Sequence, residues 1–465
     1  MPSWTIGSPN FLNESRSECN SRRRPESPTL NLQDPSQASR DIPSQHPMTQ
    51  HVVVLGNGIT GATAALRLRE LQPDWRITLV SGESDHPFSR PALMYLYMGH
   101  LKYAGTKLHE DSVWDDERIE RVRAWVTNID AKGRTLQLHG REPLAFDQLL
   151  IATGSKPNKF DWPGQDLKRV SGLYTLMDLQ RLYDASPQIR RGVVVGGGLI
   201  GIELAEMLHS RRIPVSLLVR ESSYWNNVLP PEESELVNRV ILEGGLDLRL
   251  GTELEEVLDD GDSACGGVRT KDGQQIDCQY VGLTAGVSPN LDLVRHSEIE
   301  TGRGILVDDS LRTNVEGILA AGDCAEIRRP EGQRNLLQQV WYTGKAQGRV
   351  AAEVLAGREA SYDPGVWYNS AKFLGLEYQT YGRVLPDLGG QESLFWQEGR
   401  QLVRIVHTGG VVTGFNFMGI RARHRVCERW IAEGATLDRV LAEIGQADFD
   451  PEFAARLADL LQPVR

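Results

Sequence analysis

Two glycine-rich segments have the spacing of loops that hold the pyrophosphate of a dinucleotide. The first places Gly56, Gly58 and Gly61 in the order GxGxxG, between the apolar run 52–55 and an alanine-rich stretch expected to be helical. In such a loop the first glycine permits a tight turn, the second lets a phosphate approach the backbone, and the third lets helix and strand pack closely. The helix N-terminus adds free N–H donors and positive potential. We therefore predict a pyrophosphate site here.

The second segment repeats this arrangement further along the chain. Gly196, Gly198 and Gly201, with Ile200 between the last two, follow the valine-rich run 193–195 and open a second expected helix. Two strand–loop–helix units of this kind predict two bound dinucleotides.

The residues after the next strand of each unit bear on the adenosine ribose. A carboxylate is expected there, because it accepts hydrogen bonds from the ribose hydroxyls. Glu83 is the candidate in the first unit, with a solvated turn carboxylate as the alternative. In the second unit the strand 215–219 is followed by Arg220, whose guanidinium suits the 2′-phosphate of NADPH. This slightly favours NADPH over NADH, and a surface ion pair between Arg220 and Glu221 is the alternative.

The order of apolar runs indicates the fold class. From His51 onward, short Val, Ile and Leu runs alternate with helical patterns, which predicts an α/β fold with parallel sheets in two Rossmann-like domains. After about Gly357 strands are followed by two helices, which predicts a third, α+β domain. The predicted segments are a disordered extension (1–47), a first domain in two parts (48–160 and 288–357), a second domain inserted into it (161–287) and a C-terminal domain (358–465).

Composition narrows the class of protein. The chain has 465 residues, 40% of them hydrophobic and 24% charged, which is the mixture of a folded globular protein. Its net charge of −11 disfavours nucleic acid and anionic membrane surfaces as partners, since both would be repelled. No apolar run approaches the ~20 residues needed to cross a bilayer. The five cysteines form no disulfide or metal-binding pattern, so we expect a cytoplasmic protein without a metal site.

Further segments complete a specific order of motifs. Residues 313–323 indicate a short apolar strand that delivers Asp323 beside a glycine, and a carboxylate there suits a polyol hydroxyl. Two similar segments indicate crossovers at which each nucleotide domain ends. They are 147–154, with Thr153 and Gly154, and 281–290, with Gly286.

This order of motifs resembles that of FAD oxidoreductases with two dinucleotide-binding domains, the pyridine-nucleotide-disulfide reductase superfamily. The likeness lies near ferredoxin reductases, apoptosis-inducing factor and NADH-dependent nitrite reductase flavoproteins, and covers roughly residues 50–375. It implies that the first loop binds FAD and that the inserted domain binds NAD(P)H. Residues 88–93, with Arg90 and Pro91, resemble the stretch that lines FAD, and residues 162–167 resemble the linker into the second domain.

The resemblance also implies roles for single residues. Asp323 would bind the ribityl chain of FAD. The helix that begins at Trp341 would face the flavin pyrimidine ring, where its positive end stabilises negative charge on the reduced flavin. Core packing is the alternative role for Trp341. The predicted cofactor-binding set also contains Val126, Thr153, Gly154 and Gly286.

Two departures from the family pattern carry information. Thiol-dependent members have a redox cysteine near the first flavin loop or a CxxC in the second domain, and neither is present, so a disulfide relay is not expected.

Met94 and Tyr95 stand where ferredoxin reductases have Ser-Lys, so the usual lysine partner of Glu203 near flavin N5 is missing. We predict that Glu203 and Tyr95 are the catalytic residues. Glu203 is expected to hydrogen-bond Tyr95 or Tyr97, with a raised pKa if it is buried. Its alternative role is to accept hydrogen bonds from nearby helix or loop donors.

The function implied is an FAD-dependent NAD(P)H:acceptor oxidoreductase, in which nicotinamide delivers hydride to the flavin. The acceptor is an iron–sulfur protein, a quinone, oxygen or a nitrite-reductase-type partner. The alternative is a redox-responsive, NAD(P)H-binding flavoprotein interaction module with little turnover. The tail resembles the family's interface domain, and its last helix is a candidate contact for docking or for a homodimer.

Overall fold

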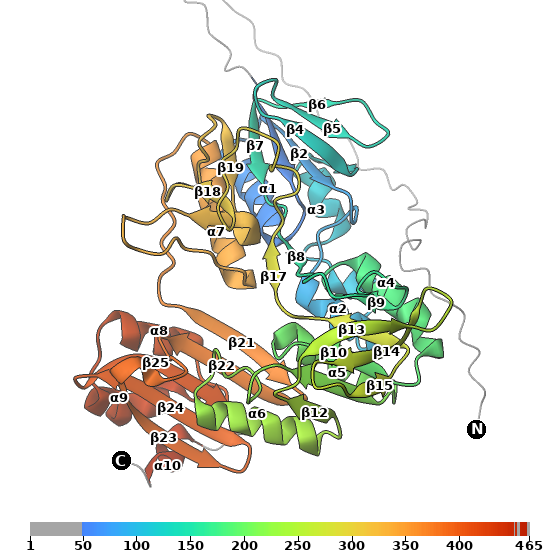
Figure 1. Ribbon diagram of the computed structural model, residues 1–465. Helices are drawn as coiled ribbons and strands as arrows, with labels where there is room; N and C mark the ends of the chain where they lie inside the picture. Colours follow the sequence, from blue (N-terminus) through green and yellow to red (C-terminus); the bar gives the residue numbers. More distant parts are fainter. Residues whose placement is uncertain (1–48, 451, 453–455, 463–465) are drawn as a thin grey trace, which may run out of the picture. The chain divides into compact units, whose positions relative to one another are not determined.

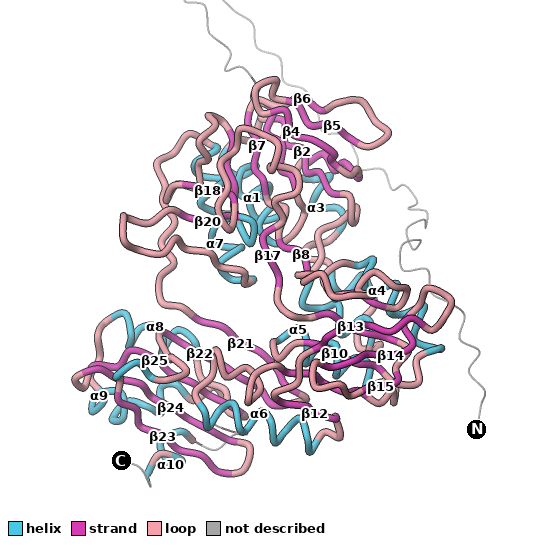
Figure 2. The backbone as a smooth tube through the Cα atoms, viewed as in Figure 1, coloured by secondary structure: helices cyan, strands magenta, loops and turns pink. Residues whose placement is uncertain are grey.

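The computed structural model describes residues 49–450, 452 and 456–462. The predicted disordered extension 1–47 lies outside the described residues. The first two domains contain both strands and helices, with runs of consecutive strands at 119–171 and 247–320, whereas the C-terminal domain is a run of strands followed by helices (Figure 2). The predicted fold class is confirmed.

A five-stranded parallel sheet forms the centre of the first α/β domain (Figure 1). Its strand order is β19–β7–β1–β2–β3, so β19, which the chain reaches only after the second domain, pairs with β7. Apolar runs such as Val52 to Val54 are fully buried, as expected in a parallel sheet covered on both faces. The sheet strands are β1 (His51–Leu55), β2 (Arg76–Ser81), β3 (Ile119–Arg123), β7 (Gln148–Ile151) and β19 (Ile318–Ala320).

Helices α1 (Ile59–Leu71) and α7 (Trp341–Leu355) pack tightly against each other in this domain, although they are distant in sequence. A Cβ atom on Gly348 would lie 2.5 Å from the carbonyl oxygen of Thr60, so only glycine permits this approach. The remaining elements of the domain are α2 (Leu93–Tyr97), α3 (Asp111–Asp116), the small sheet β4 (Val126–Asp130), β5 (Thr135–Leu138) and β6 (Leu144–Ala145), and the pair β18 (Ile305–Val307) and β20 (Ala325–Ile327).

The second α/β domain repeats the design. Its parallel sheet has the order β12–β11–β10–β16–β9, with an antiparallel sheet β13–β14–β15 beside it. The chain enters and leaves this domain through the antiparallel pair β8 (Ser155–Pro157) and β17 (Val287–Pro289). Its elements are β9 (Val170–Ser171), α4 (Leu176–Ala185), β10 (Gly192–Val195), α5 (Leu199–Ser210), β11 (Val215–Val219), α6 (Pro231–Glu243), β12 (Asp247–Leu250), β13 (Leu254–Asp259), β14 (Cys265–Thr270), β15 (Gln275–Asp277) and β16 (Tyr280–Leu283).

The described part of the C-terminal domain is an antiparallel sheet of order β21–β22–β25–β24–β23 with three α-helices. Its core contains large side chains, among them Phe415, Phe417 and Trp430, which are fully buried. Its elements are β21 (Tyr368–Phe373), β22 (Leu376–Gly382), β23 (Glu392–Glu398), β24 (Gln401–Thr408), β25 (Val411–Met418), α8 (His424–Ala432), α9 (Leu437–Glu443) and α10 (Leu457–Leu460).

The C-terminal sheet packs on α6 of the second domain through a buried ion pair. Arg404 of β24 donates to Glu233 of α6 from Nε at 2.7 Å and from Nη2 at 2.9 Å. The two side chains are 3% and 0% exposed. Such a pair is tolerated because hydrogen bonds from Arg404 and from Asn416, at 3.1 Å, satisfy the Glu233 carboxylate.

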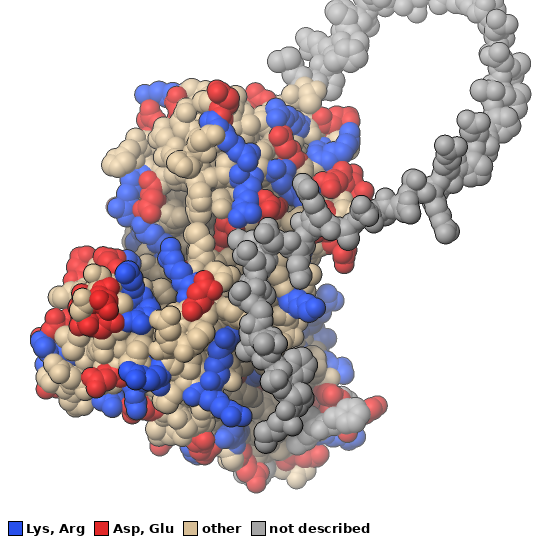
Figure 3. Space-filling view, turned by 90° about the vertical axis from the view of Figure 1, so that its right-hand side faces the viewer, with Lys and Arg blue, Asp and Glu red and all other residues tan. Residues whose placement is uncertain are grey.

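Both signs of charge are interspersed over the described part of the face shown in Figure 3. No helix among the described residues is long and apolar enough to cross a membrane.

Candidate functional site

The first glycine loop joins β1 to α1 and has the geometry of a phosphate cradle. Gly56 has φ +113°, and a Cβ there would lie 2.1 Å from the carbonyl oxygen of Ala152. A Cβ on Gly61 would lie 1.9 Å from the carbonyl oxygen of Gly56. Gly58, which caps α1, would direct a Cβ into open space with no heavy atom within 4 Å. An anion can therefore approach the N-terminus of α1 at Gly58.

The second glycine loop joins β10 to α5 and reproduces this geometry. Gly196 has φ +125°, and its Cβ would lie 2.5 Å from the carbonyl oxygen of Thr284. A Cβ on Gly201 would lie 2.5 Å from the carbonyl oxygen of Gly196, while one on Gly198 would meet no heavy atom within 4 Å. Ile200 follows in the first turn of α5. The residues present therefore fit two dinucleotides.

Asp323 lies in a hydrogen-bonded group at the end of β19. Its Oδ2 accepts a hydrogen bond from Ser155 Oγ at 3.0 Å and from Tyr174 Oη at 3.4 Å. Gln339 donates to Ser155 Oγ at 2.7 Å. Burial raises the pKa of the Asp323 carboxyl, and burial also raises the pKa of Tyr174 to about 12. A partly buried carboxylate among hydroxyl groups suits a polyol chain, which brings further hydroxyl donors.

Thr153, Gly154 and Gly286 lie in the connections between the domains. Thr153 Oγ1 donates to the carbonyl of Asn290 at 3.1 Å, and Asn158 N–H donates to the carbonyl of Gly286 at 3.1 Å. Gly154 has φ +71°, and its Cβ would lie 2.9 Å from Tyr174 Oη. These residues shape the crossover beside Asp323.

Glu83 and Arg90 pair with each other. Arg90 donates to Glu83 from Nη1 at 3.1 Å and from Nη2 at 2.9 Å, and the backbone N–H of Leu176 donates to Glu83 Oε1 at 2.8 Å. The Glu83 side chain is only 11% exposed, so the solvated turn carboxylate considered from the sequence is wrong. Both carboxylate oxygens have protein partners, and a ribose contact by Glu83 stays a prediction. Pro91 continues the short 3-10 helix that starts at Arg90.

Trp125 is a residue that sequence reasoning missed. It lies next to Val126, the first residue of β4, and its ring packs where a side chain on Gly82 would stand, 2.3 Å from the Cβ position. Trp125 as a whole residue is nevertheless 51% exposed. Gly82 follows β2, the position expected for the adenosine ribose, so Trp125 offers an aromatic face there. The contact between Trp125 and Gly82 depends on how distant segments of the chain pair, which the sequence pattern does not show.

Glu203 lies on α5, which contacts the α2 helix that carries Tyr95 and Tyr97. In the described part of the chain no hydrogen bond joins Glu203 to either tyrosine. Tyr97 Oη pairs instead with Ser186 Oγ at 2.6 Å, and the predicted bond from Glu203 to Tyr95 or Tyr97 is wrong. Burial, with a smaller contribution from Glu206, raises the pKa of Glu203 to about 7, in the predicted direction.

Trp341 begins α7, and this helix holds the Asp323 loop. Gln347 of α7 accepts a hydrogen bond from the backbone N–H of Gly322 at 2.7 Å. Trp341 itself is partly buried.

Arg220 follows β11 and is 72% exposed, with Nη2 2.8 Å from Glu221 Oε1. The surface pair considered from the sequence is therefore present. It leaves most of the guanidinium accessible to an anion.

The fold brings together two cysteines that the sequence separates by thirteen positions. The Sγ atoms of Cys265 and Cys278 are 3.7 Å apart, and both residues are fully buried as free thiols. They pack with Val193 and Leu218 in the core of the second domain, whereas α2 packs in a different cluster. The juxtaposition was not foreseen because it depends on strand pairing.

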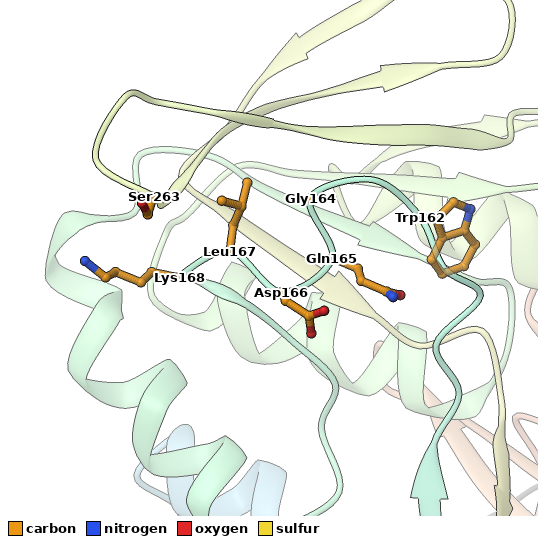
Figure 4. Close-up of a pocket in the computed structure, with 7 residues that line it drawn as sticks. All are labelled: Trp162, Gly164, Gln165, Asp166, Leu167, Lys168 and Ser263. Atoms are coloured by element: carbon orange, nitrogen blue, oxygen red, sulfur yellow. The ribbon is translucent and has the colours of Figure 1, made fainter.

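A separate pocket of about 440 Å³ lies between the linker into the second domain and the turn at Ser263 (Figure 4). None of the predicted site residues lines it. Its lining residues are Trp162, Gly164, Gln165, Asp166, Leu167, Lys168 and Ser263.

Comparisons with known sequences agree with this geometry. The family described as pyridine nucleotide-disulphide oxidoreductase matches residues 50–348. The chain is 30% identical over 318 residues to the ferredoxin–NAD(+) reductase component of the p-cumate 2,3-dioxygenase system of Pseudomonas putida, covering 68% of this chain and 77% of that protein. It is 30% identical to the ferredoxin reductase component of the chlorobenzene dioxygenase of Cupriavidus sp. (strain PS12), covering 72% and 82%. The nitrite reductase of Bacillus subtilis (strain 168) is 28% identical over 72% of this chain and 41% of that protein.

A solved structure shares the fold. A ferredoxin reductase from Rhodopseudomonas palustris superposes with a TM-score of 0.73 at 23% identity, over 90% of this chain and all of that one. Two glycine-loop domains and a C-terminal α+β domain together define an FAD- and NAD(P)H-dependent oxidoreductase. The chain belongs to the pyridine nucleotide-disulphide oxidoreductase family. It passes electrons from NAD(P)H through FAD to an acceptor, as the sequence predicted.

The raised pKa of Glu203 predicts a pH-dependent effect of Glu203→Gln. Between the ordinary value of 4.5 and about 7 the unfolded chain loses the proton while the folded chain keeps it, so wild-type stability falls as pH rises through this window. Glutamine removes that loss. The variant should gain stability relative to wild type across the window and then level off, by at most about 3 kcal/mol.

The measurement is urea unfolding of both holoproteins at a series of pH values. Glu235→Gln, the same substitution at an exposed position of α6, is the matched control. Parallel pH profiles for wild type and Glu203→Gln would contradict the prediction.

Proposed function

We propose that this chain transfers electrons from NADPH to a small iron–sulfur protein of the ferredoxin type. The observation that carries the proposal is the presence of two open glycine loops, at Gly58 and Gly198, on one chain. Two relatives at 30% identity are named as ferredoxin reductase components, which supports the class of acceptor. The cysteines that the structure describes are all buried, which supports chemistry without a thiol relay.

We assign FAD to the first α/β domain, residues 48–160 and 288–357, and NAD(P)H to the inserted residues 161–287. FAD, when bound, accepts hydride from nicotinamide and releases single electrons. In the first domain Asp323 would hold the ribityl chain. The N-terminus of α7 would face the flavin, where its partial positive charge stabilises negative charge.

Glu203 and Tyr95 are the proposed catalytic residues, on two helices that contact each other. Because its pKa is about 7, Glu203 keeps its proton in a large fraction of molecules at neutral pH. The neutral form of Glu203 is favoured because a buried carboxylate without a cation partner is energetically costly.

The location in the cytoplasm and a homodimer remain predictions of the sequence. Quinone and oxygen as acceptors, and the low-turnover interaction module, are alternative outcomes of the tests below, and a nitrite-reductase-type partner is the remaining alternative acceptor.

Valine substitutions at the two open glycines test the assignment of the cofactors. Neither new side chain would meet protein atoms at its Cβ, so each variant should fold while filling the space of one pyrophosphate. We expect Gly58→Val to be purified without FAD. We expect Gly198→Val to keep its flavin absorbance while its Kd for NADP+ rises about tenfold or more. Loss of FAD from Gly198→Val and its retention by Gly58→Val would reverse the assignment.

Arg220→Ala tests the choice of donor. If the guanidinium binds the 2′-phosphate, the KM for NADPH should rise about tenfold, as expected for loss of a charge-assisted hydrogen bond. The KM for NADH should change little, because NADH lacks that phosphate. Steady-state reduction of an artificial acceptor with each donor gives both values, and equal changes would refute the role.

Anaerobic stopped-flow absorbance tests the acceptor. The holoprotein is mixed with NADPH or NADH, and the reduced protein is then mixed with an oxidised ferredoxin. We expect rapid bleaching of the flavin band, faster with NADPH, followed by many turnovers of ferredoxin reduction. Gly198→Val is the control, and its flavin band should bleach about tenfold more slowly at an NADPH concentration below the Kd. Slow bleaching with a persistent charge-transfer band would favour the interaction module, and turnover with quinone or oxygen alone would exclude a ferredoxin partner.

A further inference from the structure

The loop 220–229, between β11 and α6, braces the second glycine loop. Tyr224 in this loop is fully buried, and its Oη donates to the carbonyl oxygen of Gly198 at 2.7 Å. That carbonyl also accepts the N–H groups of Gly201 and Ile202, at 3.1 and 3.2 Å, within the first turn of α5. The helical bonds set the local shape of the glycine loop. The Tyr224 bond fixes its position relative to the loop that carries Arg220.

Two side chains of helix α6 form hydrogen bonds with the backbone of Tyr224 and hold it in place. Asn238 accepts the N–H of Tyr224 at 2.9 Å, and Ser234 Oγ donates to the Tyr224 carbonyl at 2.6 Å. Ser234 is fully buried. Both polar groups of the Tyr224 backbone therefore depend on one face of α6.

The next residue, Trp225, carries the contact to the C-terminal domain. It has φ +57°, a conformation that is costly for a large side chain and persists only where the surroundings hold it. Its ring centroid lies 5.7 Å from that of Phe373 on β21 and 5.7 Å from that of Tyr378 on β22. Phe373 is fully buried, so the aromatic contact belongs to the core between the two domains.

The same helix α6 is tied to the C-terminal sheet by the ion pair of Glu233 with Arg404. The loop 220–229 is thus fixed to the C-terminal domain twice, directly through Trp225 and indirectly through α6. On its other side it meets the glycine loop through Tyr224.

We propose that Tyr224 is a positioning residue of the dinucleotide site, and that the C-terminal domain sets nucleotide affinity through Trp225. The proposal rests on the assignment of the second glycine loop to NAD(P)H, and it is independent of the electron acceptor. The pyrophosphate is common to NADP+ and NAD+, so the brace affects both nucleotides equally. An equal effect on both nucleotides distinguishes the role of Tyr224 from that of Arg220, which would affect the binding of NADP+ alone.

Tyr224→Phe tests the brace, because it removes only the hydroxyl group. Titration calorimetry of the flavin-loaded protein with NADP+, and separately with NAD+, measures affinity without turnover. The Kd should rise about threefold to tenfold for both nucleotides, as expected for the loss of one hydrogen bond.

Tyr280→Phe is the matched control. Tyr280 is buried in β16 of the same domain, and its Oη bonds to Ser171 Oγ at 3.0 Å, away from the glycine loop. It should lower the thermal unfolding midpoint to a similar extent and leave both Kd values unchanged. An unchanged Kd in Tyr224→Phe, or equal changes in the two variants, would overturn the positioning role. Failure of the cofactor assignment appears separately, as a Gly198→Val variant that binds NADP+ normally.

Phe373→Leu tests the contribution of the C-terminal domain. Phe417→Leu is its control, the same substitution at a fully buried position of β25 in another cluster. We expect Phe373→Leu to raise the Kd of both nucleotides by about twofold to fivefold, and Phe417→Leu to leave them unchanged. If Phe373→Leu does not retain FAD, Trp225→Phe tests the same contact from the other side. Equal Kd values in the tested variant and the control would overturn the coupling.

Discussion

The close approach of backbone to backbone at the glycine loops is the constraint on which the rest of the structure depends. A methyl group on Gly61 or Gly201 would collide with the carbonyl of the first glycine in its own loop. The absence of that methyl group lets the helix start directly over the end of the strand. The positive end of the helix then faces open space at Gly58 or Gly198, where a pyrophosphate can be held by N–H groups and the helix dipole.

Helix α2 and Glu203 on α5 lack the redox cysteine and the lysine partner that related flavoproteins have. Helix α2 carries Tyr95 and Tyr97 and no cysteine, and Tyr97 is engaged by Ser186. No cation among the described residues pairs with Glu203, and burial raises its pKa to about 7. Burying a charged carboxylate is unfavourable. Glu203 avoids this by staying protonated rather than by forming an ion pair.

The C-terminal domain joins the second α/β domain through contacts that are characteristic of a protein core. The ion pair of Arg404 with Glu233 is almost fully buried, and Trp225 packs against both Phe373 and Tyr378. Under the proposed coupling, a change on one side of this junction reaches the nucleotide loop on the other, because packed cores shift between discrete arrangements rather than deforming smoothly.

The sequence by itself determined the two glycine loops, the fold class, the family and the position of Asp323 at the end of a strand. Each of these rests on local spacing, and the geometry of a strand, turn and helix follows from neighbouring residues. Only the tertiary structure decided that Glu83 pairs with Arg90, that Cys265 meets Cys278, and that Tyr224 reaches Gly198. These contacts join segments separated by other elements, so they depend on strand order and on which helix faces pack together. Local spacing does not encode that information.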